Sequence, residues 1–265
     1  MAANPFDHVL DSDHWHISDA LHWGFHIPFG LSKFMVLELI AAVAILLIFL
    51  PIANRARSGE PPRGLFWNAF ESLLTFIRDK VAKPYLDHDA DKFVPFLWTL
   101  FLFILFCNLL GMFPFMGSPT ASIMVTGALA VITFFLIHGA AVAKMGVGGY
   151  FKSYFPHMEI PYGMGYVLIS MIAFIEMFGQ LIKAFVLAVR LFANMMGGHT
   201  VLAVIMLFIV MAKDSALYIS GPITIASVLG VTAFSLLELF VAFLQAFIFT
   251  FLTAIFLGTT LHPAH

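Results

Sequence analysis

A permanent positive charge lies inside one of the most apolar stretches of the chain. Arg190 belongs to the run KAFVLAVRLFANMMGGH, which extends from Lys183 to His199. A guanidinium stays protonated at any accessible pH, so burial cannot remove this charge. An arginine at the centre of a membrane helix costs about 2.5 to 3.5 kcal/mol on insertion scales, and it usually faces a bundle interior, a water-filled cavity or a charged partner. Arg190 is therefore a candidate functional residue.

Further polar residues recur at helical spacing around Arg190. Glu176, Lys183 and Arg190 are seven residues apart, and two helical turns return each of them to nearly the same face. Gln180 and Asn194 follow Glu176 and Arg190 by four residues and extend this polar stripe. A network that only fixes helix packing is the alternative interpretation. It is less favoured, because such a network rarely uses an arginine.

Groups that can exchange a proton occur on both of the last apolar segments. Glu238 and Gln245 are seven residues apart and share one helical face. His199 follows Arg190 by nine residues, so a straight helix directs it to the opposite side, although Gly197 and Gly198 could bend the helix there. Each of His199 and Glu238 could be a satisfied core residue. Together they suit a proton relay, because histidine titrates near neutrality.

The composition identifies an integral membrane protein. Of 265 residues, 61% are hydrophobic and only 11% are charged, and the mean hydropathy is +0.97, far outside the range of a soluble domain. The formal net charge of -2 gives no sign of nucleic-acid binding, and no nucleic-acid partner is expected. Cys107 is the single cysteine and has no metal-ligating neighbours in the sequence. We expect no metal and no cofactor.

Residues 1–33 are expected to form an extracytoplasmic N-terminal arm. The first 32 residues contain no Lys or Arg, which argues against a cleaved signal peptide. The arm is rich in Asp and His. His14 and His16 could share a metal ion, but an exposed anionic arm is the favoured interpretation.

The remaining residues, 34–265, are expected to form a single polytopic membrane domain of the all-α class. A bilayer core of about 30 Å requires about 20 apolar helical residues. Five membrane-crossing helices are predicted, together with an amphipathic surface helix at about 66–83, where charges interrupt the apolar residues. The predicted spans are 34–52, 93–113, 123–142, 164–211 and 223–261.

The last two spans are too long for one upright crossing. Helices of 48 and 39 residues would extend about 72 and 59 Å, roughly twice the apolar thickness of a bilayer. Each region either breaks into two spans or forms one strongly tilted helix. The sequences contain no internal proline or polar turn, so we favour two long tilted helices that pair as a hairpin.

The distribution of Lys and Arg predicts the orientation. The connection between the first two spans is basic and is therefore expected in the cytoplasm. This places the N-terminus, the uncharged turn at Pro114 and the Lys213 loop outside, and the Lys144–Lys152 loop and the C-terminus inside. A bacterial plasma (inner) membrane is favoured. The basic residues of the first connection are Arg55, Arg57, Arg63, Arg78, Lys80, Lys83 and Lys92.

Three segments resemble subunit a of the F-type ATP synthase membrane sector. They are the run from Lys183 to His199, the segment ELFVAFLQAFIFTFLTAIFL from Glu238 to Leu257, and NLLGMFP from Asn108 to Pro114. The elements R-L-F-x-N and Q-A-F-I-F are specific, and the similarity extends from about Phe66 onward. The resemblance implies a proton-translocating, non-catalytic stator subunit with two offset half-channels. It also implies a ring of c subunits carrying an intramembrane carboxylate, peripheral-stalk b subunits and membrane lipid as partners.

The resemblance also implies roles for individual residues. Arg190 matches the essential arginine that faces the rotor, and Gln245 matches the glutamine opposite it on the last helix. Polar positions of the outer half-channel correspond to Asn194, His199 and Glu238, and an acidic position nearer the inner half-channel corresponds to Glu176. Lys183 belongs to the same polar stripe and is the last of the candidate residues for proton translocation.

Two other classes of membrane protein fit the sequence less well. A stand-alone proton-coupled transporter usually has internal repeats and broken helices, and the sequence shows neither. A redox subunit could bind haem through His138 and His199 as axial ligands. Both are much less favoured than the stator subunit.

Overall fold

The computed structural model describes residues 14–18, 23–26, 32–57, 64–113, 117–155, 165–212 and 217–262. Within these residues, five helical segments are long and apolar enough to cross a membrane. Large hydrophobic side chains such as Phe185 and Leu236 are exposed on the long helices, as expected of surfaces that face lipid. The protein is therefore an all-α membrane protein with several potential crossings, as its composition predicts.

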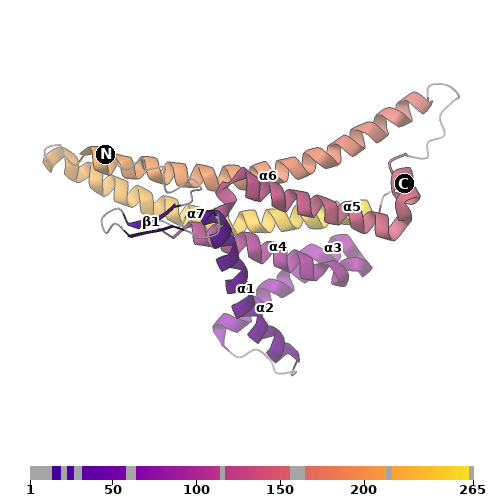
Figure 1. Cartoon of the computed structure of the whole chain (residues 1–265), viewed down its shortest axis with the longest axis horizontal. Helices are drawn as coiled ribbons and strands as arrows, with labels where there is room; N and C mark the ends of the chain where they lie inside the picture. Colours follow the sequence, from indigo (N-terminus) through magenta and orange to yellow (C-terminus); the bar gives the residue numbers. More distant parts are fainter. Residues whose placement is uncertain are drawn as a thin grey trace.

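Two long helices form the spine of the molecule. Helix α6 (Gly165–Ala212) has 48 residues and α7 (Leu217–Leu261) has 45. They lie side by side over much of their length and run along the long axis of the molecule (Figure 1). Each region is one continuous helix, which confirms the prediction of two long helices paired as a hairpin. The pair Gly197 and Gly198 lies inside α6 without ending it.

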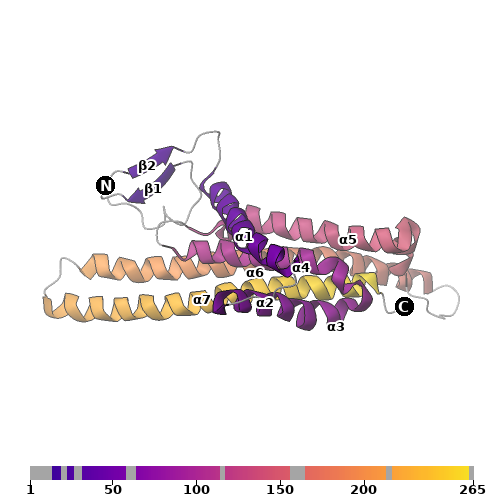
Figure 2. The same cartoon turned by 90° about the horizontal axis from the view of Figure 1, so that it is seen from below.

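The helices α4 (Ala90–Gly111) and α5 (Ile123–Ser153) pack against the spine where α6 begins and α7 ends (Figures 1 and 2). Helix α4 is mostly apolar, and 12 of its 22 residues are buried, which is typical of a helix at the centre of a bundle. Its Asn108 donates a hydrogen bond to the backbone oxygen of Ala242 in α7, at 3.1 Å. The Asn108 carboxamide oxygen accepts a hydrogen bond from Thr120, at 2.6 Å.

Helix α1 (Lys33–Arg57) runs across the direction of the spine and projects to one side (Figure 1). The chain then returns toward the spine through three consecutive segments: α2 (Leu65–Phe76), a π-helical segment (Ile77–Ala82) and α3 (Lys83–Leu86). A short 3-10 turn (Asp87–Asp89) joins α3 to α4, and another (Pro119–Ala121) precedes α5. Strands β1 (His14–Ser18) and β2 (Trp23–His26) form an antiparallel hairpin near the start of α1 (Figure 2).

The helix ends differ from the sequence-based expectations at three places. Helix α1 passes Pro51 and ends at Arg57, and α7 begins before Pro222. A proline removes one backbone hydrogen bond, and membrane helices tolerate this loss because neighbouring helices, side chains and water compensate for the freed backbone group. Helix α5 passes the glycine-rich region through a kink at Gly146, whose φ of 75° favours a residue without a side chain.

Some of the predicted features lie outside the described residues. They are Arg63, the turn at Pro114, the Lys213 loop and the last three residues. The candidate metal ligands His14 and His16 belong to β1, but their side chains also lie outside the described part. The hairpin of β1 and β2 was not predicted, because only nine residues take part in it and the surrounding sequence is dominated by His and Asp.

Candidate functional site

Arg190 lies in the middle of α6, on an exposed part of its surface. Its guanidinium forms no hydrogen bond and has no carboxylate within 4.0 Å among the residues that the structure describes. The neighbouring Leu191 is fully buried, so the helix presents one side to the bundle and turns Arg190 away from it. An uncompensated charge at membrane depth is costly. The arrangement therefore suits a partner outside this chain.

One turn further along α6, a hydrogen bond links the two long helices. The side-chain amide of Asn194 donates to Oε1 of Gln245 in α7, at 2.7 Å. Gln245 is 1% exposed, and its amide nitrogen has no hydrogen-bond partner among the described residues. This bond fixes the Gln245 side chain beside the segment that carries Arg190. The glutamine therefore lies on the inner side of the helix pair, bonded to a residue one turn from Arg190.

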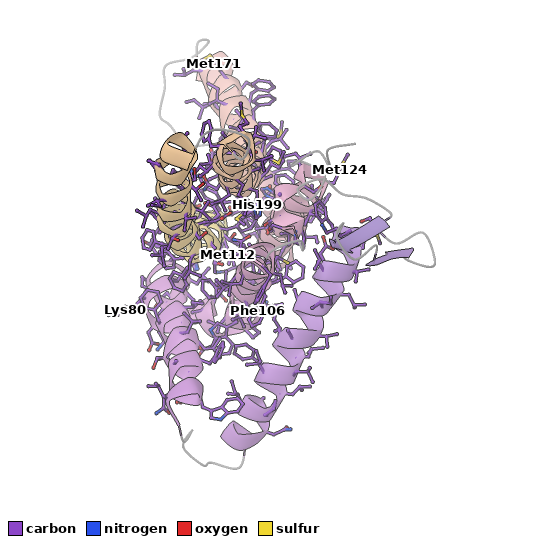
Figure 3. The ribbon with its side chains drawn as sticks, turned by 90° about the vertical axis from the view of Figure 1, so that its left-hand side faces the viewer. Lys80, Phe106, Met112, Met124, Met171 and His199 are labelled. Atoms are coloured by element: carbon purple, nitrogen blue, oxygen red, sulfur yellow. The ribbon has the colours of Figure 1, made fainter. Side chains whose placement is uncertain are left out.

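His199 and Glu238 face each other across the same helix pair. Nδ1 of His199 lies 3.5 Å from Oε1 of Glu238, and the two side chains are 11% and 6% exposed. Figure 3 places His199 inside the bundle, whereas Lys80 lies at its edge. The contact lacks hydrogen-bond geometry, and both Nε2 of His199 and Oε1 of Glu238 are buried without a hydrogen bond among the described residues. The two groups are close enough to exchange a proton directly or through one water.

Gly198 provides the space for the Glu238 carboxylate. A Cβ atom at position 198 would lie 2.8 Å from Oε1 of Glu238 and 3.2 Å from its Cδ, whereas a Cβ at Gly197 would contact nothing within 4 Å. The two adjacent glycines therefore have different roles. The sequence suggested that the pair could bend the helix; in the structure the helix continues through the pair, and one of the two glycines accommodates an acid.

A cavity of about 280 Å³ lies between α6 and α7 beside this acid. Most of its lining is apolar, and its polar side chains are those of Asn194 and Glu238. Buried polar atoms without a hydrogen bond cost about 1 to 3 kcal/mol each, so the orientation of Glu238 favours a hydrated occupant of this space. Residues that line it include Asn194, Gly197, Gly198, Phe234, Leu237 and Glu238.

Lys33 also lies in this region, although the sequence pattern did not mark it as a candidate functional residue. It begins α1, is only 3% exposed, and interacts electrostatically with His199. The sequence contained one signal, since Lys33 is the first cation of the chain and directly precedes an apolar span. Nothing in the pattern, however, indicated that α1 would bring it close to α6.

Glu176 and Lys183 lie farther toward the beginning of α6. They are on the same stripe as Arg190, but the structure does not bring them together with His199 and Glu238. Glu176 is half-buried. Lys183 is exposed, and its ammonium lies 5.2 Å from the centre of the Phe256 ring, within the range of a cation–π contact. At about 1.5 Å per residue, Glu176 and His199 are about 34 Å apart along the helix.

The haem hypothesis finds no support in the surroundings of the two histidines. His138 lines a cavity beside Gln180, and Gln180 and His199 are 19 residues apart on α6, or about 28 Å along its axis, so the two histidines cannot bind one iron. Among the described residues, no group of three or more His, Cys, Asp or Glu side chains is arranged to hold a metal ion.

Comparison with known proteins gives a consistent family. The family model described as ATP synthase A chain matches residues 35–258. The chain is 38% identical over 271 residues to "ATP synthase subunit a 2" of Prosthecochloris aestuarii, covering 100% of this chain and 77% of that protein. It is 35% identical to "ATP synthase subunit a" of Chloroherpeton thalassium, covering 97% and 78%. A protein of the same name from an Anaeromyxobacter species is 40% identical, with 98% and 63% covered.

Proposed function

Since the chain belongs to the family of ATP synthase A chains, we propose that it is the proton-translocating stator subunit of the membrane sector of an F-type ATP synthase. It is not itself catalytic in this proposal. It guides protons to and from a rotor, and rotation of that rotor drives ATP synthesis elsewhere in the complex. The observation that carries the proposal is the exposed Arg190 guanidinium on a long membrane helix, which has no partner among the described residues.

The proposed partner of Arg190 is a carboxylate on each c subunit of a rotor ring. Two unit charges 4 Å apart attract by about 4 kcal/mol at an effective dielectric of 20. This attraction lowers the pKa of a passing carboxylic acid by roughly three units, against which desolvation acts. Each rotor carboxylic acid is therefore forced to release its proton at Arg190. The fixed positive charge also prevents protons from passing directly between two aqueous channels.

The outer half-channel is assigned to the region around His199 and Glu238. The cavity beside Glu238 and the contact with His199 support this assignment, because they place two proton-exchanging groups next to a space that suits water. Asn194 and Gln245 connect this region to the segment that carries Arg190. The inner half-channel is assigned to the region of Glu176 and Lys183, nearer the beginning of α6.

A strongly tilted spine agrees with this division of roles. A helix of 48 residues is about 72 Å long, so it fits within the apolar thickness of a bilayer only at a steep tilt. Helix α1, with 25 residues, has a length suited to a more upright crossing and runs across the spine (Figure 1). In this orientation, α6 and α7 lie along the rim of a rotor ring and present Arg190 to successive c subunits.

The remaining parts of the proposal concern the surroundings of the subunit. We place it in a bacterial inner membrane, with residues 1–33 outside and the C-terminus in the cytoplasm, because the connection between α1 and α4 is basic. Residues 34–265 then form one membrane domain, and the segment at about 66–83 lies on the cytoplasmic surface. Peripheral-stalk b subunits and lipid complete its contacts.

The outer half-channel is tested by the substitution Glu238→Gln in the assembled complex. The amide keeps the size of the side chain but cannot take up a proton. We expect ATP synthesis driven by a proton gradient to slow by about tenfold or more, which corresponds to about 1.4 kcal/mol in the barrier. The measurement is the initial synthesis rate in vesicles, normalised to the amount of co-purified c ring. An unchanged rate contradicts the role of Glu238.

A further inference from the structure

A second chain of proton-exchanging groups lies at the far end of α5. The hydroxyls of Tyr154 and Tyr150 are 2.5 Å apart, and the Tyr150 hydroxyl is 2.7 Å from Nδ1 of His138. On a straight helix, His138 and Tyr150 would be separated by about 18 Å along the axis. The kink at Gly146 turns the last part of α5 back and brings them into contact. The chain thus depends on a specific break in the helix.

His138 borders a small cavity that faces α6. The cavity has a volume of about 20 Å³, enough for about one water molecule, and Thr133 and Gln180 contribute polar groups to its lining. Gln180 follows Glu176 by four residues and precedes Lys183 by three, so it belongs to the polar stripe of α6. The cavity therefore separates His138, at one end of the hydrogen-bonded chain, from the helix that carries Arg190.

At the other end of the chain, Tyr154 directly follows α5 and is 7% exposed. Burial raises the pKa of Tyr154, and the hydrogen bond that it shares with Tyr150 and the nearby Glu176 carboxylate raise it further. Tyr154 is therefore a neutral phenol that can both donate and accept a hydrogen bond. A phenol and an imidazole are suited to passing a proton along, because each can accept one proton while releasing another.

We propose that His138, Tyr150 and Tyr154 form a proton relay that connects Gln180 on α6 with the inner aqueous phase. This inference rests on the proposed function, because it requires proton flow through the subunit. A proton that binds Nε2 of His138 is balanced by release of the Nδ1 proton to Tyr150. The hydroxyl proton of Tyr150 passes to Tyr154, whose own proton leaves to the inner phase. Rotation of the two hydroxyls and tautomer exchange of the imidazole restore the starting arrangement.

The relay lies apart from the groups assigned to the outer half-channel. Figures 1 and 2 show the end of α5 beside the beginning of α6, at the opposite end of that helix from Ala212. Glu176 is the only carboxylate that acts on Tyr154 among the described residues. Its carboxylate can take up the proton that Tyr154 releases, before that proton reaches the inner phase.

The substitution Tyr150→Phe tests the relay, because it removes the central hydroxyl and keeps the ring. Proton conduction is measured on the whole complex in vesicles under an imposed membrane potential, in H2O and in D2O. We expect conduction to fall by about tenfold. Positioned acid–base groups in enzymes contribute roughly 10²- to 10⁴-fold, and the loss here is smaller because water can replace the missing hydroxyl. We also expect a larger solvent isotope effect than in the unmodified complex, since proton delivery becomes rate-limiting.

Two further variants make the result specific. Tyr85→Phe is the matched control, because Tyr85 lies in α3 and packs its ring against Phe251 without belonging to the relay; it should conduct normally. Tyr154→Phe removes only the terminal hydroxyl and replaces Tyr150→Phe if that variant fails to assemble with the c ring. Normal conduction with an unchanged isotope effect overturns the relay. Slow conduction with an unchanged isotope effect also overturns it, because that result indicates a packing defect. Neither outcome affects the test of Arg190, so the proposed function is judged separately.

Discussion

At the scale of single residues, glycine and charge together define the region around Glu238. Arg190, His199 and Glu238 were selected from the sequence because ionisable groups are rare and costly at membrane depth. The roles of Gly198 and Lys33 were not predictable. A glycine that accommodates a side chain from another helix has no local signature, since the contact between Gly198 and Glu238 joins residues 40 positions apart in the chain.

The substitution Gly198→Ala tests the space beside Glu238. The added methyl group would meet the end of a flexible side chain, so the carboxylate should move away while the fold remains intact. We expect proton conduction to fall by about threefold to tenfold, equivalent to about 0.7 to 1.4 kcal/mol, with little change in thermal stability. Gly197→Ala is the matched control, because a Cβ there contacts nothing within 4 Å. Equal conduction in the two variants would contradict the proposed role of Gly198.

At the scale of helices, the apolar run lengths predicted the two long helices, but helix ends and kinks depended on tertiary structure. The glycine-rich region after residue 142 had the composition of a loop, yet helix resumes after Gly146 and buries Tyr154. The expected surface helix contains a π-helical segment, in which Ile77, Val81 and Ala82 are buried. Such features follow from contacts between helices, which a periodic pattern in one helix does not encode.

One close contact between helices can be tested through stability. Gly258 in α7 lies against the backbone of α3, where an added Cβ would be 2.3 Å from the carbonyl oxygen of Tyr85. Because backbone cannot move aside easily, we expect Gly258→Ala to destabilise the protein by about 1 to 3 kcal/mol. Gly230→Ala is the control, since its nearest neighbour, Ile205, is at an ordinary 3.7 Å. Thermal unfolding of the purified membrane sector compares the two; equal unfolding temperatures would show that α3 is not held closely against α7.

At the scale of the whole molecule, the sequence predicted the class of fold, but it did not predict how the candidate proton-exchanging residues are distributed in space. The two long helices pair along their length, so His199 and Glu238 meet while Glu176 lies about 34 Å away along α6. This separation is what an indirect proton route requires. If two half-channels do not meet, a proton crosses the membrane only by riding on a moving partner, and transport is coupled to rotation.

The most direct test of this coupling is ATP-driven proton pumping by complexes that carry Arg190→Ala. The variant should assemble with the c ring, because the guanidinium forms no salt bridge within 4.0 Å to any described residue of its own chain. Its removal therefore breaks no interaction that holds the fold together. Pumping into vesicles should fall below detection, since no fixed charge remains to remove the proton from the rotor carboxylic acid. Pumping at the normal rate in the assembled variant would contradict the role of Arg190 and, with it, the proposed mechanism.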